Sequence, residues 1–314
     1  MVELRFFHVF LGQHMSEWID ASHGIVIGRP HWRAVAHRVL APYLVYGLSH
    51  LTASYQAALI WFMGTVLFAA KVLWFSLVKR LTGCEATALR YTVLFSALFI
   101  MMQDRMWILP WDIVDLLVFS LFAYGIYKGC RTRFFVVLFF IELLNREAAL
   151  FIALWIVLDG LRFVHPRGWW TIEVVNRGRV ALGGALLVGG MAVTKWLRDS
   201  LFETSHFPWV GTDEAHRVLG NHIYLFRNLG DFFRNFASLE NAAISLGLLA
   251  VVVLFVRSWQ KQNRMVRLTL LWGAMVFNIF FFGLINETRM WQMLIPFVLL
   301  LVLQGAPAEV VSEE

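Results

Sequence analysis

Long apolar stretches recur along the whole chain, and short polar segments separate them. A helix that crosses a bilayer needs about 20 consecutive apolar residues, with a range of about 17–25. Stretches shorter than this have to extend into flanking polar turns or line a cavity inside the protein. The pattern therefore predicts an all-α fold, a polytopic transmembrane helix bundle in which some segments are short or re-entrant. The nine stretches are Ser54–Val78, Tyr91–Met102, Leu116–Tyr127, Phe134–Leu144, Ala148–Leu158, Val180–Thr194, Asn241–Val256, Leu268–Ile285 and Met290–Leu303.

The composition agrees with a membrane protein. Of the 314 residues, 59% are hydrophobic, 16% aromatic and 15% charged, against about 45–50% apolar and about 25% charged residues in soluble proteins. This balance excludes a water-soluble enzyme, which needs a more highly charged surface, and a disordered chain, which needs fewer apolar residues. The two cysteines, Cys84 and Cys130, lie in basic connections, and a disulfide between them is not expected in a reducing compartment.

The charged residues are divided between alternate connections. Four connections are basic, and the connections between them hold most of the acidic residues. By the positive-inside rule the basic connections are cytoplasmic, which places the N-terminus outside and the C-terminus in the cytoplasm. The net charge of +6 then reflects orientation and anionic lipid headgroups, and no nucleic-acid partner is expected. The basic residues concerned are Lys79, Arg80, Arg90, Lys128, Arg131, Arg133, Arg162, Arg167, Arg177, Arg179, Arg257, Lys261, Arg264 and Arg267.

The first 53 residues differ from the rest of the chain. Apolar positions in Val35–Leu51 recur at helical spacing, which predicts an amphipathic helix lying on the outer membrane surface. We divide the chain into an outer N-terminal segment (1–53), a transmembrane bundle (54–306) that includes an outer loop (195–240), and a cytoplasmic tail (307–314).

Two polar clusters interrupt the apolar pattern on the predicted outer side. Asn145, Arg146 and Glu147 separate two stretches that each rise only about 16 Å as a helix. These side chains are therefore expected below the membrane surface, where ionisable groups are costly and functional sites are common. A structural interpretation is equally open, in which arginine and glutamate neutralise each other at a helical turn. The same combination of amide, carboxylate and guanidinium recurs before the last stretch in Asn286, Glu287 and Arg289.

Further candidates lie in the other outer connections. Asp112 and Asp115 follow a proline at spacing i, i+3, which places both carboxylates on one helical face. Acidic residues in a first turn also serve in ordinary helix capping. The guanidinium groups of the outer segment suit a phosphate held at the headgroup level. Its six histidines are typical of an interfacial loop, because no pair has the close spacing of metal ligands. The candidates of this segment are Glu17, Asp20, Arg33 and Arg38.

Four short motifs resemble elements of bacterial polytopic membrane proteins. They are HRVLAPYL (His37–Leu44), PWDIVD (Pro110–Asp115), LNREAALF (Leu144–Phe151) and NETRMW (Asn286–Trp291). In the layout of their spans these proteins are similar to the GT-C superfamily, glycosyltransferases that use polyprenyl-phosphate sugars on the outer membrane face. The resemblance implies a bacterial inner-membrane location and an acidic residue in the first outer loop that acts on the acceptor. Glu17 and Asp20 occupy that region, and Asp112 or Glu147 are alternatives.

Three functions remain compatible with these observations. The first is glycosyl transfer from a lipid-phosphate donor to a glycan acceptor. A carboxylate (Asp20, Asp112 or Glu147) would take the acceptor's proton, and arginines would hold the departing phosphate (Arg33, Arg38, Arg146 or Arg289). The second is a transporter or flippase for a lipid-linked or polar substrate, and the third is a non-catalytic membrane subunit. We expect membrane lipids as partners and neither a metal nor another cofactor.

Overall fold

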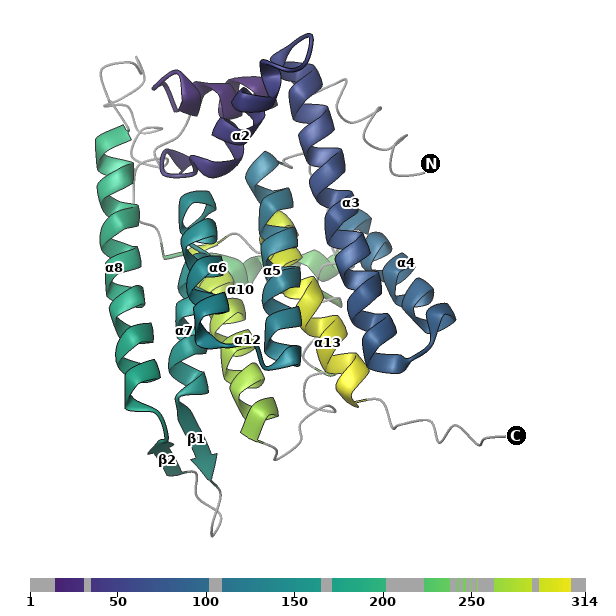
Figure 1. Ribbon diagram of the computed structural model, residues 1–314, viewed down its shortest axis with the longest axis vertical. Coiled ribbons are helices and arrows are strands. Elements are labelled where there is room, and N and C mark those ends of the chain that lie inside the picture. Colours follow the sequence, from purple (N-terminus) through teal and green to yellow (C-terminus); the bar gives the residue numbers. More distant parts are fainter. Residues whose placement is uncertain are drawn as a thin grey trace.

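The computed structural model describes residues 15–30, 35–101, 109–164, 171–201, 223–237, 263–283 and 288–305, with isolated positions between 242 and 253. Its helices run mostly along one common direction and form a bundle (Figure 1). Helix α2 (Leu40–Ser49) lies across the upper end of this bundle. The connection between α3 (Tyr55–Thr82) and α4 (Glu85–Met101) lies at the lower end, as does the short β-hairpin.

The first long helices have clear start and stop signals. Ser54 is the N-cap of α3, and its hydroxyl accepts a hydrogen bond of 3.1 Å from the amide of Ala57. Gly83, at φ 69°, ends this helix in the left-handed conformation that glycine adopts without strain. Helix α5 (Pro110–Lys128) begins on proline, and the Asp112 carboxylate accepts a 2.9 Å hydrogen bond from the amide of Leu109. The capping interpretation of Asp112 is therefore confirmed.

Helices α6 (Thr132–Asn145) and α7 (Ala149–Asp159) form a short hairpin, joined by residues 146–148. With 14 and 11 residues they rise only about 21 Å and about 16 Å, against a hydrocarbon core of about 30 Å. The sequence predicted two such short halves, and the structure confirms them. Their connection lies inside the outline of the bundle, below α2 (Figure 1).

Helix α8 (Arg177–Leu201) packs along α7 after a two-stranded antiparallel hairpin. In the hairpin, β1 (Leu161–Val164) pairs with β2 (Thr171–Val174), and this is the one departure from the all-α expectation in the described chain. Gly183 makes the close approach of α8 possible, because a Cβ at this position would lie 2.8 Å from the Val157 nitrogen and 2.9 Å from the Ala153 oxygen.

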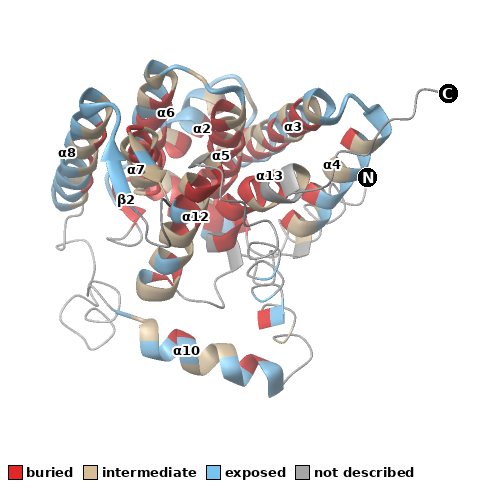
Figure 2. Cartoon of the chain, turned by 90° about the horizontal axis from the view of Figure 1, so that it is seen from below, coloured by how far each residue is buried: buried red, intermediate tan, exposed pale blue. Residues whose placement is uncertain are grey.

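The described C-terminal part contains α10 (Leu225–Arg234), η3 (Asn235–Ala237), α12 (Asn263–Phe282), η4 (Thr288–Leu294) and α13 (Ile295–Gly305). Helix α10 lies at the edge of the bundle (Figure 2). It is held there by Asn228, whose amide nitrogen donates to the carbonyl oxygens of Phe280 at 2.7 Å and Gly283 at 2.8 Å. These bonds satisfy backbone acceptors left over at the C-terminal end of α12.

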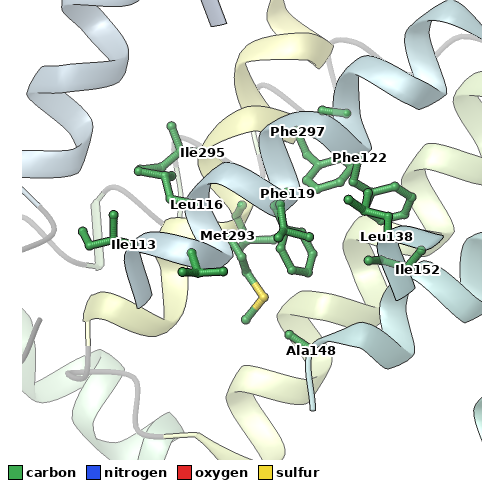
Figure 3. Close-up of a cluster of buried hydrophobic side chains, with 14 of the residues drawn as sticks. Ile113, Leu116, Phe119, Phe122, Leu138, Ala148, Ile152, Met293, Ile295 and Phe297 are labelled. Carbon is green, nitrogen blue, oxygen red and sulfur yellow. The ribbon is translucent and has the colours of Figure 1, made fainter. Parts of the chain in front are cut away.

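Helix α5 forms the centre of the core and is buried on most sides (Figure 2). Its Phe119 and Phe122 meet Phe297 of α13 edge to face, with ring centroids 6.1 Å and 5.4 Å apart (Figure 3). The outer helices, in contrast, expose large apolar side chains such as Trp61, Phe68 and Val188. An apolar outer surface of this kind is typical of a protein that faces lipid.

Among the residues that the structure describes, four helices are long and apolar enough to cross a membrane: α3, α5, α8 and residues 264–282 of α12. They cover most or all of four of the nine stretches found in the sequence. The stretch Leu116–Tyr127 looked too short, but α5 begins at Pro110 and reaches 19 residues. Most of Asn241–Val256 lies outside the described residues, as do positions 1–14 and the tail 307–314.

Helix α2 covers the central part of the amphipathic helix predicted over Val35–Leu51. Helix α2 packs inward through Ala41, Pro42 and Val45. The predicted apolar stripe is divided: Val35 is buried, whereas Leu44 is 49% and Leu51 84% exposed. The outward direction of the two leucine side chains fits an apolar surface in contact with lipid.

Candidate functional site

A buried polar cluster lies where the α6–α7 connection meets the start of α5 and the segment before α2. Buried ionisable groups are rare in an apolar core unless each is paired or serves a function. Three separate parts of the chain contribute to the cluster. Its members are His37, Arg38, Asp112, Asp115, Glu142, Asn145, Arg146 and the half-buried Glu147.

Arg146 joins two carboxylates of one helical face. One of its terminal nitrogens, Nη1, lies 3.0 Å from Oδ1 of Asp112 and 2.6 Å from Oδ2 of Asp115. All three side chains are almost fully buried. The i, i+3 spacing predicted that the two aspartates share a face, and the structure shows that this face holds a guanidinium from another helix pair.

Asn145 fixes the same junction from the end of α6. Its amide nitrogen donates to the backbone oxygen of Trp111 at 3.1 Å and to Oδ1 of Asp115 at 2.8 Å. Asp115 therefore accepts from Asn145 at one carboxylate oxygen and from Arg146 at the other. Because both of its oxygens accept a hydrogen bond, the free-energy cost of removing the Asp115 carboxylate from water is compensated.

Glu147 faces the segment before α2. Its Oε2 lies 2.6 Å from Nε2 of His37, and its Oε1 accepts from Nη2 of Arg38 at 3.4 Å. Arg38 also lies over the ring of Trp111, 5.5 Å from the ring centroid, in a cation–π arrangement. The outer segment is thus tied to both α5 and the α6–α7 connection.

The charges around Glu147 set its protonation state. Burial opposes its ionisation, but attraction by Arg38 and the hydrogen bond from His37 prevail and hold the pKa of Glu147 well below its usual range. Burial lowers the pKa of His37, and Glu147 only partly offsets this effect. At neutral pH the pair is therefore a carboxylate beside a neutral imidazole whose Nε2–H donates to it.

A cavity of about 290 Å³ begins at this cluster. Arg146 and Glu147 form its polar end, and Asn278 is the other polar lining residue. The rest of the lining is apolar and comes from α7, α8, α12 and η4. Its volume is close to the lower end of the range of small-molecule sites, about 300–1,000 Å³. The apolar lining includes Leu150, Phe151, Leu154, Leu187, Phe277 and Met293.

The structure brings six candidate residues of the sequence together: Arg38, Asp112, Asp115, Asn145, Arg146 and Glu147. The arginine and glutamate of the α6–α7 tip each have partners on other segments, so the tip is more than a self-neutralised turn. Glu17 and Asp20 are exposed on a helix over residues 15–26. Arg33, Asn286 and Glu287 lie outside the described residues, as does the side chain of Arg289.

Two members of the cluster were missed as site residues in the sequence. His37 was grouped with the other histidines of the outer segment, although it directly precedes a candidate arginine. Glu142 was not considered, although a single carboxylate inside the apolar stretch Phe134–Leu144 is itself a signal of a buried interaction.

Within the described ranges, no three His, Cys, Asp or Glu side chains form a group that could hold a metal ion. Comparison of the chain with protein-family models, with curated proteins and with solved structures returns no match. The arrangement of the cluster and its cavity therefore carries the functional argument.

Proposed function

We propose that this chain is an integral protein of the bacterial inner membrane with about nine apolar segments, an outer N-terminus and a cytoplasmic C-terminus. The connections α3–α4 and α5–α6 and the β-hairpin share one end of the bundle (Figure 1). That end contains Lys79, Arg80 and Lys128, and basic residues favour the cytoplasmic side. The polar cluster then lies toward the outer side, below the membrane surface.

The proposed activity is transfer of a sugar from a lipid-phosphate donor at this cluster, as in GT-C enzymes. The single observation that carries it is the position of Glu147, an ionised and partly exposed carboxylate at the polar end of an otherwise apolar cavity. Such a cavity suits a ligand that has a polar head and an apolar chain.

The cavity also reaches the outer surface of the bundle. Phe277 and Phe282 line it and are 54% and 60% exposed. In a membrane this side faces lipid, so the apolar chain of a donor can enter from the bilayer without crossing water. The sugar and its phosphate then lie at the polar end, beside Glu147.

In the proposed reaction Glu147 accepts the proton of an acceptor hydroxyl. The hydroxyl oxygen forms a bond to the anomeric carbon of the sugar, and the bond from that carbon to the lipid phosphate breaks. The lipid phosphate leaves with the electron pair. Asp112 is a poor candidate for the base, because it is buried and accepts from both Arg146 and the Leu109 amide.

The arginines have different roles in this proposal. The charge of Arg146 is balanced by two carboxylates, so we assign it to positioning Glu147 rather than to binding phosphate. Arg38 contacts Glu147 directly and orients it. Arg33 and Arg289 remain the proposed phosphate ligands, and this assignment rests only on the sequence pattern.

The activity is tested with purified protein in liposomes that contain polyprenyl-phosphate sugars, with soluble glycan acceptors added outside. We expect product with the wild type and a rate about 10²–10⁴-fold lower in Glu147→Gln. Glu173→Gln, in the exposed strand β2, is the matched control and keeps the wild-type rate. Equal rates in Glu147→Gln and the wild type would remove Glu147 from the mechanism.

The same liposomes separate the two other functions. Movement of the lipid-linked sugar across the bilayer without a new glycosidic bond would identify a transporter or flippase. Neither movement nor product with any donor would support a non-catalytic subunit.

A further inference from the structure

Glu142 is a buried carboxyl group that the proposed reaction does not use. It lies in the last turn of α6, one residue before Leu143 and three before Asn145, and its exposure is 0%. Neither of its carboxyl oxygens has a hydrogen-bond partner of normal geometry among the described residues. A charged carboxylate in this position would be very unfavourable, because burial removes its water and nothing replaces it.

The neighbours of Glu142 show which form it takes. The Asp115 carboxyl group acts on it most strongly, followed by Arg146 and Asn145. Both oxygens of Asp115 already accept hydrogen bonds, from Asn145 Nδ2 and from Arg146 Nη1. Amide and guanidinium N–H groups only donate, so Asp115 is an ionised carboxylate with acceptor capacity left.

Two neighbouring buried carboxyl groups are stable only when they share a proton, because two ionised groups repel each other. The oxygen of Asn145 is a further buried acceptor without a partner of normal geometry. The nearby donors are already engaged: Asn145 Nδ2 donates to the Trp111 oxygen and to Asp115, and Arg146 Nη1 to Asp112 and Asp115. Glu142 therefore needs a donor of its own. An un-ionised carboxylic acid supplies that donor in its O–H group.

The charge balance of the cluster points the same way. Asp112 and Asp115 carry two negative charges on α5, and Arg146 supplies one positive charge. Charged groups from α2, α7 and α8 are not among the main influences on Glu142. An ionised Glu142 would add a further negative charge to a site that already has one in excess.

We propose that Glu142 holds a proton and donates its O–H to Asp115, so that the two residues form a proton-binding site beneath the candidate active site. Loss of this proton would make Glu142 a competitor of Asp112 for Arg146, which is one of the residues at the polar end of the cavity. Protonation of Glu142 thus controls the position of Arg146. This inference does not depend on the proposed transfer reaction.

The site is tested by infrared spectroscopy of the protein in lipid at neutral pH. An un-ionised carboxylic acid has a carbonyl-stretch band that is separate from the bands of ionised carboxylates. We expect such a band in the wild type, and we expect Glu142→Gln to lack it. Glu85→Gln is the matched control, because Glu85 is exposed and ion-paired to Lys79, and it keeps the band. Identical spectra for the wild type and Glu142→Gln would overturn the proposal.

A second measurement needs no substitution. Wild-type protein is produced in cells supplied with glutamate that carries carbon-13 in its side-chain carboxyl group. If a glutamic acid produces the band, its frequency shifts. Labelled aspartate leaves the band in place. A band that moves with aspartate labelling, or the absence of any un-ionised acid band, would contradict the assignment to Glu142.

Discussion

Arg146, in the α6–α7 connection, lies 3.0 Å from the Asp112 carboxylate in the first turn of α5, and both side chains are buried. Asp112 also caps its own helix through the Leu109 amide. One carboxylate therefore starts α5 and attaches the α6–α7 tip to it. The polar cluster is at once a structural junction and the polar end of the cavity, so its variants have to be tested for folding as well as for activity.

Removing the guanidinium is expected to be strongly destabilising. Arg146→Met leaves Asp112 and Asp115 buried without their shared cation, and loss of one partner from such a group costs about 3–5 kcal/mol. Thermal unfolding in detergent measures the effect. Adding Asp112→Asn and Asp115→Asn to Arg146→Met removes the unpaired charges and should recover much of the loss. A single variant as stable as the wild type would contradict the arrangement described here.

The stability of the protein is expected to fall in acid, in two steps. The pKa of His37 is lowered from 6.5, so the unfolded chain takes up this proton first and stability declines below about that pH. The pKa of Glu147 is lowered well below 4.5, so a further decline begins near that value. Thermal midpoints across this range measure both steps. Glu147→Gln should lose the lower step and keep the upper one, whereas a flat profile in the wild type would exclude both.

Local patterns predicted the short helices and their polar tip, but not how the tip is paired. The lengths of α6 and α7 follow from the apolar stretches on either side of Asn145. His37 and Glu147, in contrast, are 110 positions apart, and no local spacing relates them. Glu142 differs from its neighbours only as one carboxylate in an apolar run, and its surroundings depend on the packing of α5.

Which face of a helix is buried could also be predicted only in part from the sequence. Periodicity located α2, but the choice between its apolar faces depends on where α3 and α5 lie. The helix packs through the small residues Ala41 and Val45 and leaves Leu44 outward. In a membrane the outer surface is apolar as well, so hydrophobicity alone does not distinguish the core from the lipid-facing side.

The packing of α7 on α8 can be tested with two neighbouring glycines. A Cβ at Gly183 would lie 2.6–2.9 Å from atoms of Val157 and Ala153, whereas a Cβ at Gly184 meets nothing within 4 Å. Gly183→Ala should therefore cost about 1–3 kcal/mol through overpacking. Gly184→Ala is the control and should be neutral or slightly stabilising. Thermal unfolding of both variants decides the point, and equal midpoints would show that α8 does not approach α7 this closely.

The proposed orientation can be tested with a native cysteine. Cys84 is exposed in the connection between α3 and α4, at the basic end of the bundle. In a Cys130→Ser background, a membrane-impermeant thiol reagent should label Cys84 in inverted inner-membrane vesicles and not in intact spheroplasts. Cys84→Ser controls for other labelling. Labelling from the outside of spheroplasts would reverse the topology.

The most direct test of the central claim is occupancy of the cavity beside Glu147 by a lipid phosphate. Ala274 lines this cavity, and Ala274→Trp should fill it. Ala185→Trp, at an exposed position of α8, adds the same side chain outside the cavity. Native mass spectrometry with added polyprenyl-phosphate sugar should show the bound lipid in the wild type and in Ala185→Trp, and little or none in Ala274→Trp. Equal binding by all three proteins would show that the cavity is not the donor site.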